Sequence, residues 1–474
     1  MPSVPADVRQ AEAEIDTAIR ALPVWQSTRD ELVRTLLDLY RDSIEMVLME
    51  VGRQRVLAEH LGPDKADLRP ALQMESQLHL GIFWALKWAV AWCPPRGAAP
   101  PAPTSLLELV WVGAAYQALA DGLWMHKQGW GRVVADLHAK TLVLHEGGDR
   151  TGRDAELAEY LHGFLAIHRH KSFTEDTDSL TRRWTAGDFR HLGAALRTAC
   201  AEACQESVVF SVTEPPTELF KRPVVLEVPD QIAERYAGLL ADLALSQDAV
   251  AESGGLWRHN NWFDTPFLAI GGRYLCPSNI LEAVFQDGVD EHMLRAAARV
   301  DPNQYPRVSQ AREERMSRFC VGELEARGWT CTAPLALHDP PADVDIYATR
   351  ANDRLALELK STLRPESPRE VASRNDEIHH GLRRSEERLR QLPAGTIGAV
   401  VTDGYHGDYR TWADALKRRI PVLTTAELSA FAKQPNATAD ALASWAATEP
   451  AGSKPLPDRE TTLMGWTLLA RDTA

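Results

Sequence analysis

The spacing of hydrophobic residues changes along the chain, and its first part has the spacing of helices. From about residue 5 to about residue 205, apolar residues recur every three or four positions, as Leu32, Leu36 and Leu39 do. Such spacing places them on one face of a helix. The segment 94–104 interrupts the pattern with prolines, which remove backbone donors and stop helices. We therefore predict long helices joined by a proline-rich connector.

Between about residues 206 and 300 the pattern becomes mixed. Short alternating segments predict strands, the segment 230–245 predicts a helix, and Gly271-Gly272 between two apolar runs predicts a β-hairpin. Residues 300–306 contain two prolines, an Asn and an Asp, which break the periodicity before a new helix begins. We place the main domain boundary in this segment.

A regular succession of elements is predicted after this boundary. A helix ending at Gly328 comes first, since glycine suits the left-handed conformation at a helix C-terminus. Three strands, a long charged helix, a buried strand, a helix and a last strand follow, at 330–337, 343–350, 354–361, 368–392, 396–404, 409–419 and 420–425. This order predicts an α/β domain with a central mixed β-sheet flanked by helices.

The chain is therefore expected to be multidomain, with a mostly α-helical N-terminal region before the α/β domain. A length of 474 residues agrees with two or three domains. Seven of the 14 tryptophans lie between Trp25 and Trp130, and we interpret this helical layer as a core or a partner-binding face. The predicted divisions are a helical domain, a mixed connecting region, the α/β domain and a C-terminal extension, at 1–205, 206–305, 306–435 and 436–474.

Composition and charge are those of an ordinary globular protein. The 52 Lys and Arg residues against 66 Asp and Glu give a net charge of −14, so a phosphate-binding surface must be local. Six scattered cysteines favour a reduced, cytoplasmic setting, and the first residues lack the pattern of a secretory signal. The most apolar stretches, 78–93 and 105–125, contain charged residues and predict buried helices, not membrane spans.

Charged residues interrupt the apolar pattern of two neighbouring predicted strands. They are Asp343, Asp345, Glu358 and Lys360. Side chains alternate between the faces of a strand, so Glu358 and Lys360 share one face, as do the two aspartates. If the strands pair, carboxylates meet across the hairpin, where they repel unless a cation lies between them. Mg²⁺, or Mn²⁺ in its place, is the expected cation because hard ions prefer carboxylate oxygens.

With this order of elements, the chain between about residues 308 and 432 resembles the PD-(D/E)XK nuclease superfamily, also called restriction-endonuclease-like. Asp345 matches the strand aspartate of that family, and Glu358 and Lys360 match the acid and the lysine of its ExK triplet. The proline with which the family's motif begins is replaced by Val344 in this chain. The resemblance implies that Asp345 and Glu358 bind the metal, and that Lys360 orients or deprotonates the attacking water. It leaves the first 300 residues unexplained.

Many members of that family add a glutamate from the first helix, and two candidates are present. Glu313 precedes the apolar Met316 and Cys320 by three and seven positions, as in related helices, whereas Glu314 turns towards the flank. We therefore assign Glu313 to the catalytic set and keep Glu314 as the second choice. Asp343 is expected to be a neighbour that does not bind the metal.

The segment after the third strand is rich in arginine and hydroxyl side chains. Ser361, Thr362, Arg364 and Arg383 are the expected contacts to a phosphate backbone. Acidic residues alternate with the arginines, and they support equally well a second interpretation, in which this segment is a solvated helix.

Together these features predict a metal-dependent phosphodiesterase that acts on DNA in preference to RNA, and as an endonuclease more than as an exonuclease. A role in bacterial defence against foreign nucleic acid suits the architecture by analogy. The helical region is expected to recognise the substrate, a protein partner or a signal. A homodimer is left open, and no membrane contact is expected. The competing hypothesis is a catalytically inactive nuclease-fold protein that binds nucleic acid or acts as a scaffold.

Overall fold

The structure is a computed structural model of the chain. It describes residues 3–61, 67, 69–129, 131–146, 172–203, 206–209, 218–221, 224–255, 258, 261–287, 289–338, 341–361, 368–403, 407, 409–434, 437–445 and 459–472. Two of the expected substrate contacts, Thr362 and Arg364, lie outside these residues.

Long helices form the first part of the chain, as the hydrophobic spacing predicts. They are α1 (Ala6–Arg20), α2 (Arg29–Leu61), α3 (Arg69–Trp92) and α4 (Pro103–Gln128), with a short 3-10 turn, η1 (Pro23–Gln26), after α1. Helices α3 and α4 approach each other closely at two glycines. A Cβ on Gly81 would lie 2.1 Å from the carbonyl oxygen of Val110, and one on Gly113 would lie 2.4 Å from that of Gly81. Larger residues there would force the helices apart.

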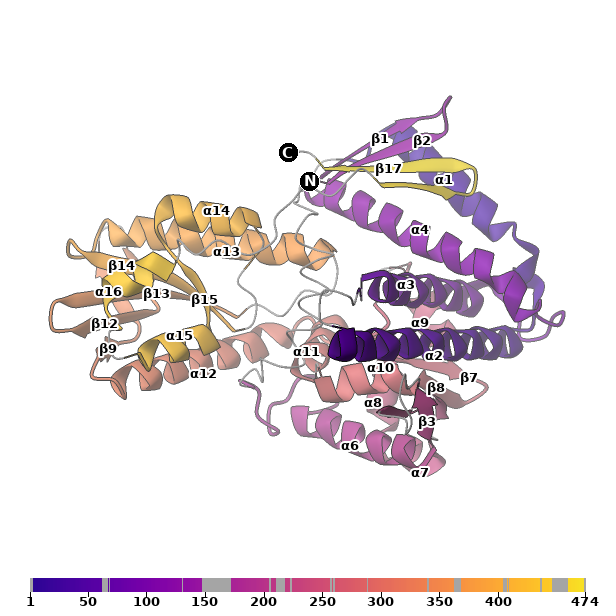
Figure 1. Ribbon diagram of the computed structural model, residues 1–474, viewed down its shortest axis with the longest axis horizontal. Helices are drawn as coiled ribbons and strands as arrows, with labels where there is room; N and C mark the ends of the chain where they lie inside the picture. Colours follow the sequence, from indigo (N-terminus) through magenta and orange to yellow (C-terminus); the bar gives the residue numbers. More distant parts are fainter. Residues whose placement is uncertain are drawn as a thin grey trace.

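The helical prediction is wrong after α4, where the chain forms a sheet. Its strands, in the order β1-β2-β17-β16, are β1 (Gly131–Asp136), β2 (Thr141–Glu146), β17 (Trp466–Asp472) and β16 (Arg459–Leu463). Leu142 and Leu144 are buried with a period of two, which is the period of a strand. The end of the expected C-terminal extension therefore returns to the N-terminal region, where β17 pairs in parallel with β2 (Figure 1).

The connecting region is mixed, as expected. Its elements are α6 (Ala186–Ala203), β3 (Glu206–Val209), β4 (Glu218–Lys221), β5 (Val225–Glu227), α7 (Asp230–Arg235), α8 (Ala237–Asp242), β6 (Ala244–Leu245), α9 (Gln247–Glu252), β7 (Phe267–Ile270), β8 (Arg273–Pro277), α10 (Ser278–Glu282), the π-helical turn η4 (Ala283–Asp287) and α11 (Val289–Val300). The Gly271-Gly272 hairpin joins β7 to β8, and both glycines have positive φ.

The C-terminal domain has the expected order of helices and strands. Its elements are α12 (Tyr305–Glu325), β9 (Thr330–Thr332), β10 (Leu335–His338), β11 (Pro341–Val344), β12 (Ile346–Arg350), β13 (Asp353–Lys360), α13 (Pro368–Leu389), β14 (Thr396–Thr402), α14 (Tyr409–Arg418), β15 (Val422–Thr424), α15 (Thr425–Ala432) and α16 (Ala439–Trp445). The sheet order is β15-β14-β13-β12-β9. Strands β9, β12 and β13 are antiparallel, whereas β13, β14 and β15 are parallel.

Two of the predicted strands are each divided into two. The segment 330–337 becomes β9 and β10, which Pro334 separates because proline cannot donate to a sheet ladder. The segment 343–350 becomes β11 and β12, and β10 pairs with β11 in a ribbon of its own. Asp345 lies in the break between β11 and β12, so it does not share a strand with Asp343 as expected.

The apolar side chains form one core in the N-terminal part and one core on each face of the C-terminal sheet. The first runs from α1 to Val308 and includes Leu463 and Trp466 of the returning hairpin. The second lies between the five-stranded sheet and α12, α15 and α16, and it also contains Phe173. The third lies under α13 and α14 on the opposite face. Figure 1 shows α13 and α14 on one side of the sheet, and α12 and α15 on the other.

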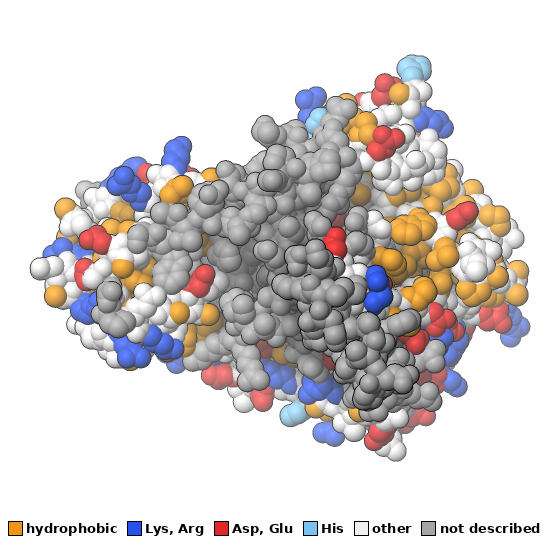
Figure 2. Space-filling view, viewed as in Figure 1, with side chains coloured by type: hydrophobic (Ala, Val, Ile, Leu, Met, Phe, Trp, Pro, Cys, Tyr) orange, Lys and Arg blue, Asp and Glu red, His pale blue; other side chains and the backbone are white. Residues whose placement is uncertain are grey.

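Hydrophobic side chains gather on the part of the surface over α3 and α4 in Figure 2. Exposed large hydrophobic residues of these helices include Met74, Leu107 and Trp111, the last with 49% of its surface exposed. Within the described ranges, the helices lack the combination of length and apolar character that a bilayer crossing needs.

Candidate active site

The alternation of side chains along β13 directs its charged residues towards α13. Leu355, Leu357 and Leu359 enter the core beneath α12, so Glu358 and Lys360 lie on the face covered by α13. Asp345 reaches the same end of the strand from the break after β11. Its Oδ2 accepts a hydrogen bond from the backbone N–H of Leu359 at 2.7 Å. Three residues assigned from the sequence therefore meet at the end of β13.

Glu358 is buried among cations. Its side chain is 1% exposed, and Oε1 lies 2.8 Å from Nζ of Lys360 and 3.2 Å from Nη1 of Arg384. Oε2 forms an ion pair with Nη1 of Arg388, which is itself buried. A buried carboxylate needs such partners, because the loss of hydration is otherwise costly. A metal ion at Glu358 would have to displace at least one arginine.

Asp343 takes part in the same ion pairs from the solvent side. It is 56% exposed, and its Oδ1 lies 3.1 Å from Nη2 of Arg388 and 3.7 Å from Nη2 of Arg384. Arg388 thus bridges Asp343 to Glu358. Asp343 therefore lies at the edge of the cluster, and it is linked to the buried Glu358 through Arg388.

Lys360 and Glu313 are close enough to shift each other's protonation. Burial lowers the pKa of Lys360, and the positive charge of Arg384 lowers it further, whereas Asp345 and Glu313 raise it. Partial burial raises the pKa of Glu313, where Lys360 acts against the shift and Asp345 adds to it. The three groups therefore share one electrostatic environment, although Glu313 itself is exposed on α12.

Glu314, the second choice for the helix glutamate, has different neighbours. It accepts a hydrogen bond from Gln310 at 3.4 Å and contributes to the raised pKa of Arg315. Both contacts lie along α12. Glu313 is the glutamate of this helix that couples to Lys360.

The sequence did not single out an ion pair beside the cluster. Arg312 and Asp403, both buried, are joined at 2.8 Å between Nη2 and Oδ2. The Ser361 hydroxyl lies between them: it donates to Asp403 at 3.1 Å and accepts from Arg312 at 3.0 Å. This contact ties α12 to the ends of β13 and β14. One signal was present, because Asp403 directly follows a strand parallel to β13, and parallel strands end on the same edge of a sheet.

The remaining expected substrate contacts are distributed differently. Ser361 is half-buried, and its hydroxyl bonds to Arg312 and Asp403 within the chain. Arg383, in contrast, is exposed on α13. His379 of α13 pairs through Nδ1 with Oδ2 of Asp414 at 3.0 Å. Glu377, which was not assigned to the site, pairs with Arg374 at 2.6 Å, and burial raises its pKa.

The acidic residues of the cluster differ in how well they could bind a metal ion. No group of three or more His, Cys, Asp or Glu residues suited to a metal is found in the described part of the chain. The charge of Asp345 adds to the raised pKa of Glu313, and a divalent cation would relieve that repulsion. Glu358 is already neutralised. Of the acids assigned from the sequence, Asp345 and Glu313 are the two whose repulsion a cation could offset.

Comparisons with known proteins add no relatives. No family model, no curated protein and no solved structure matches the chain.

Proposed function

We propose that the C-terminal domain is a metal-dependent nuclease of the PD-(D/E)XK class that hydrolyses phosphodiester bonds, with DNA as the preferred substrate. One observation carries the proposal: Asp345 accepts the backbone N–H of Leu359 at the end of β13, beside Lys360 and Glu358, and the charge of Glu313 reaches Lys360. The order α, β, β, β, α, β around a sheet with three antiparallel strands and a parallel fourth supports the restriction-endonuclease-like assignment.

The side chains of the cluster divide the chemistry between them. Asp345 and Glu313 would hold Mg²⁺ or Mn²⁺, which supplies charge neutralisation and a more acidic water when bound. Lys360 gives up its proton more readily than an ordinary lysine, because burial lowers its pKa. It is therefore suited to accept a proton from the nucleophile or, while protonated, to neutralise phosphate oxygens. The Arg312–Asp403 pair fixes α12, and hence Glu313, beside the strand end.

The wider proposal keeps the expectations from the sequence. It comprises a cytoplasmic endonuclease in bacterial defence and a protein partner for the helical N-terminal region. Trp111 on α4, almost half exposed, supports the partner because a large apolar side chain gains free energy when a second protein covers it.

A second candidate function is a nuclease-fold protein that binds nucleic acid without cutting it, or that serves as a scaffold. The ion pairs of Glu358 with Arg384 and Arg388 favour it, because they satisfy the acid that the sequence assigned to the metal. In this case the arginine-rich helix α13 makes the contact with phosphate groups.

Cleavage assays separate the two functions. Labelled single- and double-stranded DNA and RNA are incubated with the protein in Mg²⁺, Mn²⁺ or EDTA. We expect cleavage that EDTA abolishes, and a fall of about 100-fold or more for Asp345→Asn and for Lys360→Met. Asp343→Asn is the control and should keep most of the activity. Binding without cleavage by the wild type would support the inactive alternative. Unchanged cleavage by the first two variants would show that the activity does not come from this cluster.

A further inference from the structure

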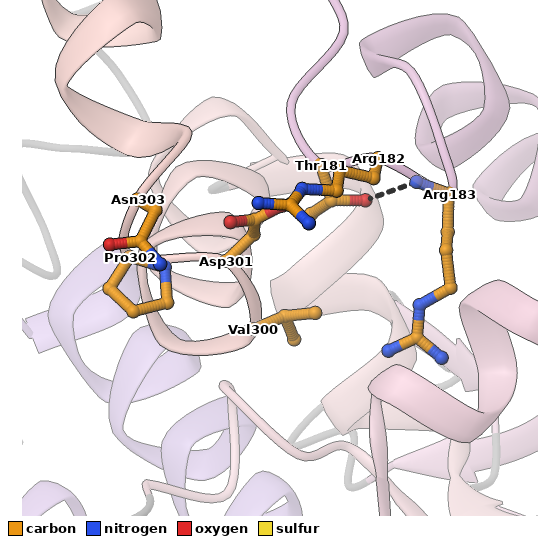
Figure 3. A pocket seen from close by; sticks show the side chains of 7 residues that line it. All are labelled: Thr181, Arg182, Arg183, Val300, Asp301, Pro302 and Asn303. Carbon is orange, nitrogen blue, oxygen red and sulfur yellow. Dashed lines mark hydrogen bonds and ion pairs between the residues drawn. The ribbon is translucent and has the colours of Figure 1, made fainter.

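A hollow of about 390 Å³ lies apart from the candidate active site, between the loop before α6 and the junction of α11 with α12. Figure 3 shows Arg183 on one side of it, Pro302 and Asn303 on the other, and the guanidinium of Arg182 beside Asp301 between them. Val300 adds an apolar wall. Small-molecule sites in proteins have volumes of roughly 300–1,000 Å³, so the hollow is large enough for a ligand of nucleotide size.

The loop that carries the two arginines is held in place by the protein itself. The Thr181 hydroxyl accepts hydrogen bonds from the backbone N–H groups of Arg183 at 3.1 Å and Trp184 at 3.2 Å. The indole of Trp184 is buried and donates to Oδ2 of Asp242 at 3.0 Å. Such a fixed loop presents its arginine side chains from a defined backbone, which lowers the entropy cost of binding a ligand.

The opposite wall is equally fixed and is tied to the loop. The Asp301 carboxylate accepts the backbone N–H of Gln304 at 3.2 Å, which closes the turn into α12. The side chain of Gln304 donates to the carbonyl oxygen of Ser179 at 3.4 Å. The two backbone segments that line the hollow are therefore joined by a hydrogen bond.

The guanidinium groups at the hollow are only partly neutralised. Arg182 is 79% exposed, and its closest acid is Asp301, with 3.6 Å between Nε and Oδ2. Arg183 pairs with the buried Asp242 but remains 58% exposed. Arg182 is the exposed partner of its pair, so its guanidinium can turn to a second anion while Asp301 keeps the hydrogen bond from the backbone N–H of Gln304.

We propose that this hollow binds a small phosphate-bearing molecule of nucleotide size. The planar fork of Arg182 matches the oxygens of a phosphate group, and Arg183 adds positive charge at the edge of the hollow. Val300 and Pro302 offer apolar contact to the organic part, and Asn303 offers an amide that donates and accepts hydrogen bonds. The site is independent of the nuclease proposal, because none of its residues belongs to the cluster at β13.

Binding to the full chain tests the proposal by calorimetry. The probes are AMP and GMP, inorganic pyrophosphate, and the nucleosides adenosine and guanosine. We expect a nucleotide to bind more tightly than pyrophosphate, and the nucleosides not to bind measurably. Arg182→Gln should raise the Kd at least about tenfold, because it removes the more exposed guanidinium from the phosphate. Because Arg182 is 79% exposed, its replacement should leave the fold intact, and thermal unfolding of the variant checks this.

The matched control is Arg273→Gln. Arg273 is also an exposed arginine of the N-terminal part, with 58% of its side chain accessible, and it also pairs with an acid, Glu227. This variant should leave the Kd unchanged. Three results would each overturn the proposal. They are no binding of nucleotides or pyrophosphate by the wild type, equal binding of nucleosides and nucleotides, and equal loss of affinity in the two arginine variants.

Discussion

Glu358 and Asp345 meet different neighbours, although both lie close to the same end of β13. Glu358 faces inward and is neutralised by Arg384, Arg388 and Lys360. Asp345 is half-buried and accepts one backbone N–H. A buried carboxylate depends on the cations around it, because removal of one leaves an uncompensated buried charge, whereas a carboxylate near like charges is suited to bind a cation. The two acids therefore predict different outcomes when they or their partners are changed.

The first prediction concerns the arginine on Glu358. Arg388→Met should lower the free energy of unfolding by about 3 kcal/mol, because it leaves a buried carboxylate without its closest partner. Denaturant unfolding followed by fluorescence and circular dichroism measures the change. Arg390→Met, which removes a 71% exposed arginine from the same segment, is the control and should change stability little. Similar values for the two variants would show that Glu358 does not depend on Arg388.

The second prediction concerns the pH dependence of Glu313. Its pKa in the folded protein is raised above the ordinary 4.5, so the unfolded chain loses this proton first as pH rises. The ionised carboxylate therefore destabilises the fold at pH 7 and not at pH 4. Glu313→Gln should have a higher Tm than the wild type at pH 7 and an equal Tm at pH 4.

The same variant distinguishes a metal site from a simple charge cluster. Mg²⁺ should raise the Tm of the wild type at pH 7 and raise that of Glu313→Gln much less, because one of the two acids has lost its charge. Glu314→Gln, one position away on α12, should respond as the wild type does. An equal Mg²⁺ response in all three proteins would exclude Glu313 as a ligand.

At the scale of elements, the C-terminal hairpin completes a sheet that begins more than 300 residues earlier. Strand β17 pairs in parallel with β2, and Trp466 is 2% exposed in the first core. Without this hairpin, β2 would present an unpaired edge to solvent, which favours pairing with other chains. The hairpin is thus part of the N-terminal fold, although it follows the C-terminal domain in sequence.

The third prediction follows from the burial of Trp466. Trp466→Ala should destabilise the N-terminal sheet by about 3 kcal/mol, since it leaves a cavity in the core. Hydrogen exchange should become faster in β2 and α4, and much less in β13 and β14. Thr461→Ala, which changes an exposed residue of β16, is the control. Uniformly faster exchange over the whole chain would contradict the separate cores.

At the scale of the whole molecule, one segment belongs to both parts. Phe173, which precedes α6 in sequence, packs into the core of the C-terminal domain, with its ring centroid 5.8 Å from that of Phe319. Nearby Asp178 pairs with Arg315 of α12 at 2.6 Å. The same segment is tied to the N-terminal part by Arg190, which bonds to Thr174 and Asp290. The two parts are therefore coupled through it.

The fourth prediction tests this coupling. Phe173→Ala should destabilise the C-terminal domain by about 3 kcal/mol, because it empties a site in that core. Faster hydrogen exchange in α12 and β13 is the expected readout. Thr177→Ala, at an exposed position of the same segment, should leave exchange there unchanged. An effect limited to α6 would show that Phe173 serves only the N-terminal part.

The sequence by itself determined the type and order of most elements. Helical spacing, strand alternation and turn residues act over a few positions, so α12, β13, α13 and β14 could be predicted from local patterns. The same local rules placed Glu358 and Lys360 on one face of β13. They also favoured Glu313 over Glu314, because helix geometry fixes the relative direction of neighbouring side chains.

Only the tertiary structure decided which groups those side chains meet. The arginines on Glu358 come from α13, Asp403 comes from the end of β14, and the partner of β2 comes from the end of the chain. The burial of a charge, and so the metal, proton or arginine it attracts, depends on residues far apart in sequence. Packing brings these residues together, and the local sequence pattern does not indicate which distant side chain will contact a given charge.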